Sequence, residues 1–279
     1  MTTVIDSLTQ AVKRQEVTGL ATLKSNERIQ RAEPRLVGSA SRALQIIELL
    51  VEDQSHELGI TQIARELGIS KSTAHQLVST LVAHGFVDQC DDSSRYRLGI
   101  RMVEAGTVAA THIGFGPALI PILEELVRKV RETCSIGVIA NRDVLLVQRV
   151  EAESVLRVDL KAGTRLPLHN SGIGRAILAA LPAPAREQAL NSLALTADEL
   201  RNTQEAIDEA ASDGYSVVRN IPVDGISAIA VAIRNRNNVP VAGLVIAGPT
   251  FRFEPTDCSD IALKTARIIS ERLGPNRVR

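Results

Sequence analysis

The spacing of hydrophobic residues predicts three short helices between residues 41 and 84. Apolar residues recur three or four positions apart in residues 41–52, 61–67 and 71–84, so each segment has one apolar face. Gly68 suits the left-handed residue that ends a helix, and Ser70 is a favourable N-cap for the segment that follows. The second and third segments are therefore expected to form two helices joined by a tight turn.

A pair of short strands is expected directly after the third helix. Gly85 closes that helix, Phe86 and Val87 begin one strand, and residues 95–97 form the returning strand. The Asp-Asp-Ser-Ser sequence at 91–94 favours a turn between them. Two helices joined by a turn and followed by a wing are typical of a DNA-binding unit whose second helix enters the major groove. We expect residues 36–99 to form such a winged helix-turn-helix.

The outward-facing residues of the third helix match the chemistry of a DNA groove. Lysine and hydroxyl groups contact phosphates, and glutamine can pair with the edge of adenine. On the returning strand, two arginines share one face and can contact phosphates. The candidate DNA-binding residues are Lys71, Ser72, Thr73, His75, Gln76, Ser79, Arg95 and Arg97.

The charge of residues 36–98 leaves an alternative to DNA binding open, in which these residues form an ordinary three-helix core with a polar face. Residues 36–98 hold eight acidic and five basic residues, whereas a DNA-binding surface usually carries a positive patch. Residues 1–35 hold six basic and four acidic residues. We expect them to form a flexible N-terminal arm that supplies further phosphate contacts.

The pattern changes after the wing. Residues 100–114 predict a linker helix with one apolar face and several small residues, which suits pairing with its copy in a second subunit. From residue 115 the chain mixes helices and strands, which predicts an α+β domain over residues 115–279 that binds an effector and self-associates. Helices are expected at 119–132, 172–181, 184–192, 197–212 and 257–273, and strands at 134–140, 143–150, 154–160, 215–220, 226–235 and 239–248.

Residues 163–181 carry the strongest candidate for a ligand site. Asn170 and Ser171 precede a helix that has Gly172 and Gly174 in its first turn, where backbone N–H groups favour an anion such as a carboxylate. Ordinary capping of a buried helix uses the same chemistry. Arg157, on an expected strand, is a second candidate for a carboxylate contact.

Composition excludes several other classes of protein. The net charge is zero, no apolar run is long enough to span a bilayer, and the first residues lack an apolar signal segment, so we expect a cytoplasmic protein without membrane contact. Cys90, Cys134 and Cys258 are far apart and form no CxxC motif, so reduced packing residues are expected rather than zinc ligands or disulfides. No metal and no cofactor are expected.

The alternative function is an enzyme that acts on a small acid and carries a regulatory DNA-binding module. His169 is the attractive acid or base, but it could also be a ligand or a packing residue, and a lone histidine is usually the last. No GxSxG or HExxH motif accompanies it. The glycines at 172 and 174 lack the preceding strand and spacing of a dinucleotide site. We therefore expect no enzyme activity.

Five runs of sequence together resemble the IclR family of bacterial transcriptional regulators: VGSASRALQIIELL, ITQIARELGISKSTAHQLVSTL, RYRLG, GTRLPLHNSGIGRAILAAL and ASDGYSVVRNIPVDGISAIAVAI. The resemblance implies an N-terminal winged helix-turn-helix, a linker helix and a C-terminal GAF-like α/β domain. It also implies binding to double-stranded operator DNA as a dimer or a dimer of dimers, and control by a small organic acid. The implied function is that of a ligand-responsive repressor of a catabolic operon.

The resemblance also places the effector between the loop and helix at 168–174 and the strands around Ser216 and Ala228. The chain departs from the family pattern at four positions. The family commonly has arginine at Gln76, acidic residues at 220 and 221, cysteine at Ala228 and proline at 232. Operator contacts and effector class are therefore expected to differ from those of relatives. The candidate effector-binding residues are Leu168, His169, Asn170, Ser171, Gly172, Ile173, Gly174, Ser216, Ser227 and Ala228.

Overall fold

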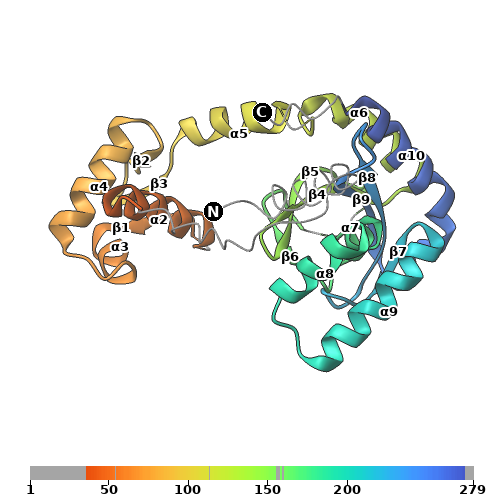
Figure 1. The fold of residues 1–279 in the computed structure, drawn as a ribbon. Coiled ribbons are helices and arrows are strands. Elements are labelled where there is room, and N and C mark those ends of the chain that lie inside the picture. Colours follow the sequence, from red (N-terminus) through yellow and green to blue (C-terminus); the bar gives the residue numbers. More distant parts are fainter. Residues whose placement is uncertain (1–35, 54, 113, 155–157, 159, 274–279) are drawn as a thin grey trace. The chain divides into compact units, whose positions relative to one another are not determined.

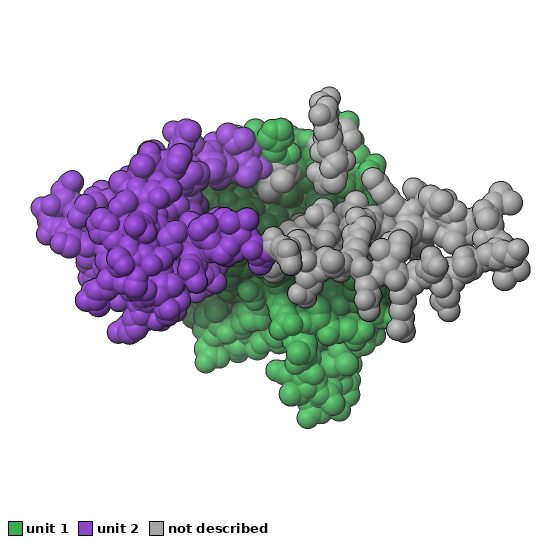
Figure 2. Space-filling view, turned by 60° about the vertical axis from the view of Figure 1, so that its left-hand side comes forward, with its two compact units in different colours: residues 1–22, 110–279 green, residues 23–109 purple. Residues whose placement is uncertain are grey.

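The computed structural model describes residues 36–273 apart from 54, 113, 155–157 and 159. The expected N-terminal arm, residues 1–35, lies outside the described residues. The chain divides into two compact units, with the boundary in the sequence between Ala109 and Ala110 (Figures 1 and 2). The N-terminal one, purple in Figure 2, is called the first unit, and the C-terminal one, green in Figure 2, is called the second unit.

The first unit is a winged helix-turn-helix, as the sequence predicts. Its helices are α2 (Gly38–Glu52), α3 (Ile60–Glu66) and α4 (Lys71–Ala83). Its antiparallel sheet has the order β1 (Leu58–Gly59), β3 (Arg95–Leu98), β2 (Val87–Gln89). Strand β1 has only two residues, leads directly into α3 and was not among the predicted strands.

The tight turn between α3 and α4 follows from two residues. Gly68 has a φ of 61°, and the N–H of Ile69 then donates to the carbonyl of Ala64 at 3.0 Å, which closes α3. The Ser70 hydroxyl accepts from the N–H of Thr73 at 3.1 Å and caps α4. The apolar faces of the three helices meet in one core, which includes Ile46, Leu50, Ile63, Ala74 and Val78.

Helix α5 (Ile100–His112) follows the wing and runs across the boundary between the units. None of its described residues is buried, and Ile100, Val103 and Val108 are each at least 60% exposed. Among the described helices, no single one is long and apolar enough to cross a membrane. One bent pair, Ile100–His112 with Pro117–Val130, has the length and composition of a membrane span only when the two helices are taken together.

The second unit is built on a six-stranded antiparallel sheet with the order β6-β5-β4-β9-β8-β7. The strands are β4 (Thr133–Ala140), β5 (Asp143–Val150), β6 (Arg165–Pro167), β7 (Ser216–Arg219), β8 (Ile226–Arg234) and β9 (Pro240–Pro249). The helices are η1 (Pro117–Leu119), α6 (Ile120–Val130), α7 (Gly172–Ala180), α8 (Ala183–Ser192), α9 (Ala197–Asp213), η2 (Pro255–Cys258) and α10 (Ser259–Arg272).

Helices cover both faces of this sheet (Figure 1). Leu123 and Leu126 of α6 pack with Ile269 of α10 against one face. Ile177 of α7 and Ile207 of α9 belong to the core on the other face. The expected α+β fold is therefore confirmed.

One predicted strand is wrong. Of residues 154–160, the described Ser154, Val158 and Leu160 lie in no strand, and the remaining four, Arg157 included, lie outside the described residues. The outer partner of β5 is instead β6, in which Pro167 pairs with Asp143. The apolar side chains of Val158 and Leu160 are packed in a small cluster rather than aligned along a sheet edge.

Candidate nucleic-acid interface and ligand cavity

The predicted groove-facing residues share the exposed side of α4. Lys71, Ser72, His75, Gln76 and Ser79 are exposed and Thr73 is half-buried, whereas Ala74 and Val78 point into the core. The hydroxyl of Ser79 lies 3.3 Å from Nδ1 of His75, one turn away. The face is therefore continuous, polar and held by an apolar core behind it, which is the form that a major groove admits.

The wing presents the two predicted arginines on one side. Arg95 and Arg97 of β3 are exposed, while Tyr96 between them is 9% exposed and packs in the core. This alternation is the normal period of a strand that covers a core on one face only. The first unit thus brings all eight candidate DNA-binding residues to exposed or half-buried positions on α4 and β3.

The second unit contains a small, partly open cavity of about 40 Å³. Its walls come from β4, β5, β6, β7, β8 and β9, from the start of α7, and from the β7–β8 loop. The described lining is mostly apolar, with Val158, Leu166 and Val218 among its members. Three hydroxyl side chains also line it, those of Thr133, Ser135 and Ser171. A mostly apolar lining with a few polar groups is typical of a small-molecule site.

Four of the ten predicted effector residues line this cavity: Ser171, Gly172, Ile173 and Ala228. The Ser171 hydroxyl also accepts from the N–H of Gly174 at 3.2 Å, so it caps α7 as well as facing the cavity. Ligand lining and helix capping, the two interpretations of this segment, therefore coexist in one residue.

The other six predicted effector residues, Leu168, His169, Asn170, Gly174, Ser216 and Ser227, are placed outside the cavity lining. Leu168 is 1% exposed and belongs to the core under α7. Arg175 holds the loop before α7, because its Nε donates to the His169 carbonyl at 3.0 Å and its Nη2 donates to Oδ1 of Asn170 at 3.2 Å. Burial lowers the pKa of the Arg175 guanidinium. This loop supports the cavity from outside.

Arg149 is a cavity residue that the sequence analysis missed. Its side chain is only 5% exposed and lines the cavity from β5. In β5, Gln148 pairs with Ile136 and Leu146 pairs with Gly137, so Val147 is an extra residue in a β-bulge. The bulge puts Leu146 and Arg149 on the cavity side and sends Val147 to the opposite core. The available signal was a lone arginine inside the apolar run 144–150.

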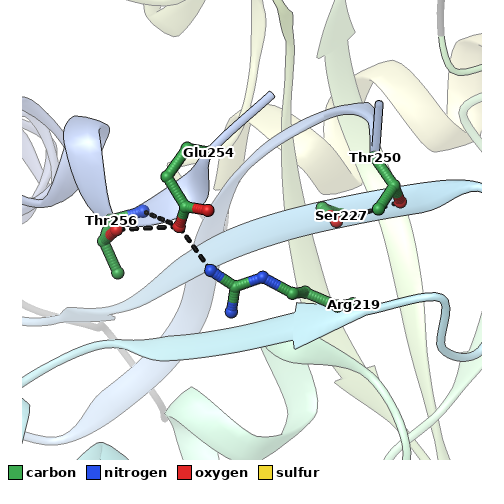
Figure 3. A network of polar contacts seen from close by, with 5 residues as sticks. All are labelled: Arg219, Ser227, Thr250, Glu254 and Thr256. Carbon is green, nitrogen blue, oxygen red and sulfur yellow. Dashed lines mark hydrogen bonds and ion pairs between the residues drawn. The ribbon is translucent and has the colours of Figure 1, made fainter. Parts of the chain in front are cut away.

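The β7–β8 loop covers part of the cavity and is tied to the end of β9. Oδ1 of Asn220 accepts from the N–H of Gly225 and from the hydroxyl of Thr250, both at 3.1 Å. Ser227 donates to the Thr250 hydroxyl at 3.0 Å (Figure 3), so this predicted effector residue helps to hold the loop in place. Ile221 is one of the loop residues that line the cavity.

An ion pair lies close to the hydrogen bonds of Thr250. Arg219 of β7 donates to the carboxylate of Glu254, which also accepts from the backbone and hydroxyl of Thr256 (Figure 3). The Thr256 hydroxyl, followed by further contacts that include Arg219, holds the pKa of Glu254 below its ordinary value. The end of β7 and the loop that follows it are thus joined to the segment after β9 by the Arg219–Glu254 ion pair and the Asn220–Thr250 hydrogen bond.

Among the larger hollows on the second unit are two of about 620 and 990 Å³. One is lined by small residues of α7 and α9 with Arg234 and Arg267, and the other by a row of charged residues around Glu132 and Arg252. Both are open to solvent and lie away from the start of α7. The small cavity is the candidate ligand site because its lining is mostly apolar and includes Ser171, Gly172, Ile173 and Ala228.

Comparison with known proteins agrees with both units. The family described as bacterial transcriptional regulator IclR C-terminal matches residues 109–271, and the IclR helix-turn-helix domain matches residues 39–91. The chain belongs to the IclR family. This IclR-family chain is similar to the HTH-type transcriptional regulator XynR of Escherichia coli strain K12, with 29% identity over 235 residues that cover 81% of this chain and 91% of XynR.

Solved structures share the fold. Pseudomonas aeruginosa HmgR matches with 26% identity and a TM-score of 0.72, covering 86% of this chain and 100% of HmgR. An IclR homolog from Microbacterium hydrocarbonoxydans, complexed with 4-hydroxybenzoate, matches with 22% identity and a TM-score of 0.74, covering 84% and 98%. At that identity the second likeness shows the fold alone.

Membership of the IclR family decides between the two functions considered above. The chain is a DNA-binding transcriptional regulator, as the helix-turn-helix match and the similar regulators show, and not an enzyme. His169, the candidate acid or base of the enzyme alternative, is held by Arg175 through its own carbonyl and lies outside the cavity lining.

Proposed function

We propose that this IclR-family regulator represses a catabolic operon and releases its operator when a small organic acid enters the cavity beside α7. The observation that carries the DNA half of the proposal is the exposed polar face of α4, backed by a closed core and flanked by Arg95 and Arg97. The N-terminal turn of such a helix reaches base edges, and cations on the wing contact phosphates.

Different roles follow for two residues of α4. Lys71, at the first helical position, contacts phosphate and contributes equally on every sequence. Gln76, one turn further on, contacts a base edge and determines sequence preference. Retardation of DNA from beside the protein's own gene, at two salt concentrations, tests both roles. Lys71→Ala should weaken binding to all fragments and reduce the salt dependence, whereas Gln76→Ala should change the order of preference among operator variants.

Lys161→Ala is the matched control, because it removes an exposed lysine from the second unit. It should leave DNA retardation unchanged. Failure of the wild-type protein to retard any neighbouring intergenic DNA at low salt would refute the proposed operator function. Equal effects of Lys71→Ala and Gln76→Ala on all sequences would refute the division of roles.

The effector half of the proposal rests on the small cavity beside α7. A volume of about 40 Å³ holds no more than a few water molecules, so an organic acid must move the walls apart when it binds. The β7–β8 loop is the wall held by side-chain contacts, through Asn220 and Thr250. A ligand that prefers the opened state shifts the protein toward it, and this differential affinity can change operator affinity.

A thermal-shift screen over catabolic acids, including 4-hydroxybenzoate, tests this half. A compound that binds the native state raises the melting temperature, and the same compound should weaken DNA retardation. A compound that raises the melting temperature but leaves retardation unchanged at saturation would refute control of the operator by that ligand.

We also propose that the protein acts as a dimer or a dimer of dimers. In the first unit, Leu44 and Val51 of α2 and Ile100 and Val103 of α5 are each more than half exposed. Exposed apolar side chains gathered on two helices are typical of a surface that another chain covers. Light scattering on the purified protein should give at least twice the chain mass of 30.0 kDa, and a monomer at micromolar concentration would contradict the proposal.

A further inference from the structure

The cavity of the second unit contains a buried cation. Among the described residues that line it, Arg149 is the only charged one, and the others are apolar except for Thr133, Ser135 and Ser171. The Arg149 side chain is 5% exposed, and the bulge at Val147 turns it toward this space. A β-bulge that re-aims one side chain into a cavity is a frequent device of functional sites.

The contacts of Arg149 point toward an anionic ligand. Its Nη2 donates to the carbonyl of Val158, and its Nε lies 3.5 Å from Oε1 of Glu151, whose side chain is 44% exposed. In a wall of low polarity, a guanidinium attracts an anion more strongly than it does in water. Its planar fork of donors matches the two oxygens of a carboxylate.

We propose that Arg149 binds the carboxylate of the effector, and that the effector is a monocarboxylate with an apolar body. The inference rests on the proposed function, in that it takes this cavity as the effector site. The carboxylate pairs with the guanidinium, and the apolar body contacts walls such as Val218 and Val245. The hydroxyls at the β4 side and at Ser171 can accept or donate one or two hydrogen bonds to a ligand hydroxyl.

Charge balance separates this class from two others. A dicarboxylate brings a second negative charge, whereas Arg149 alone carries a positive charge among the described lining residues, so a single carboxylate matches that lining. A sugar acid brings several hydroxyls into a mostly apolar space, where each unpaired hydroxyl is penalised. The amide of the same acid has nearly the same shape but lacks the charge that Arg149 binds.

Titration of the full-length protein with matched pairs of probes tests the proposal. The probes are isovalerate, benzoate, phenylacetate and 4-hydroxybenzoate, each with its own amide, together with succinate, terephthalate and gluconate. At least one monocarboxylate should raise the melting temperature and give a measurable Kd. Its amide should bind at least about 30-fold more weakly, because loss of one partner of a buried charge pair costs at least that much.

Variants of the arginine assign the effect to its side chain. Arg149→Met should weaken binding of the responsive monocarboxylate at least about 30-fold and remove the preference over the amide. Arg149→Lys keeps the charge but not the fork, so it should bind between wild type and Arg149→Met. If Arg149→Met does not unfold cooperatively, the lysine variant carries the comparison. Arg142→Met, an exposed arginine in the turn before β5, is the matched control and should bind like wild type.

The outcomes separate this inference from the proposed function, because DNA retardation is measured on the same samples. If no monocarboxylate of the panel binds, or if a dicarboxylate, gluconate or an amide binds as well as the best monocarboxylate, the inference is overturned. Unchanged affinity in both Arg149 variants also overturns it. Operator binding that persists in these cases leaves the proposed regulator intact, whereas loss of DNA binding by the wild-type protein removes the proposed function itself.

Discussion

Gly174 in the first turn of α7 offers a sharp test of how the start of this helix is packed. A Cβ built at this position lies 1.9 Å from the carbonyl oxygen of Leu168 and 2.7 Å from its carbonyl carbon. Both are backbone atoms of the loop before α7, which Arg175 fixes through the carbonyl of His169. Gly174→Ala therefore cannot be relieved by rotation of a flexible side chain, and the loop or the helix must shift.

The size of the effect follows from two opposing contributions. Overpacking of a tight site typically costs about 1–3 kcal/mol, and a backbone clash of this depth belongs at the upper end. Replacing glycine by alanine inside a helix returns at most about 1 kcal/mol. We expect a net loss of about 2 kcal/mol in the free energy of unfolding. For a unit of this size that lowers the melting temperature by about 4–8 °C.

Gly172→Ala is the matched control, two residues earlier in the same helical turn. Its Cβ would lie 3.4 Å from Cβ of Ala230 and Cγ2 of Val218, which is ordinary van der Waals contact. Its melting temperature should stay within about 2 °C of wild type, while the added methyl group narrows the cavity and weakens effector binding. Thermal unfolding of both variants by circular dichroism gives the comparison. Equal melting temperatures for Gly174→Ala and wild type would show that the packing argument is wrong.

Three further predictions concern the second unit. Arg252 binds the carboxylate of Glu132 at 2.8 and 3.0 Å. Arg252→Met leaves that carboxylate buried without this partner, so the variant should lower the free energy of unfolding, measured in urea, by about 2 kcal/mol. The double variant with Glu132→Gln should recover part of the loss. The backbone and then the hydroxyl of Thr196 hold the pKa of Glu199 below its ordinary 4.5. This capping contact therefore stabilises the fold fully above the unfolded-state pKa, and the stabilisation is lost as pH falls through the lower folded-state pKa. Glu199→Gln should flatten the curve of stability against pH below pH 4.5, and an unchanged acid limb of that curve would contradict this. Burial raises the pKa of the Cys134 thiol, so it should not react with a thiol reagent at pH 8 until the protein unfolds, whereas rapid reaction in the native state would show that the site opens.

The DNA-binding unit was largely predictable because its signals are local. Helices α2, α3 and α4 follow from apolar residues at helical spacing, and the turn follows from Gly68 and Ser70, which are close together in the sequence. Strand β1 was missed because two residues, Leu58 and Gly59, are too short to show any alternation. Its pairing with β3 is a tertiary contact that no local pattern encodes.

The ligand cavity was predictable only around the start of α7. Ser171, Gly172 and Ile173 lie in one run with a helix-capping signal, and all three line the cavity. Arg149 was hidden because strict alternation along β5 groups it with Val147, which faces the opposite core. The extra residue of the bulge breaks that alternation, and its presence depends on the register between β5 and β4.

The position of the cavity itself depends on two glycines that are far apart in the sequence. Gly137 of β4 and Gly243 of β9 are cross-strand partners, and Ile173 of α7 lies against both. An added Cβ would lie 3.0 Å from Cδ1 of Ile173 at Gly137 and 2.6 Å from its Cγ2 at Gly243. Because no side chains rise from the sheet at this point, the start of α7 can approach it closely and bring Ser171 to the cavity wall. Each glycine alone indicates only a weakened strand, and their role exists only once β4 and β9 are paired.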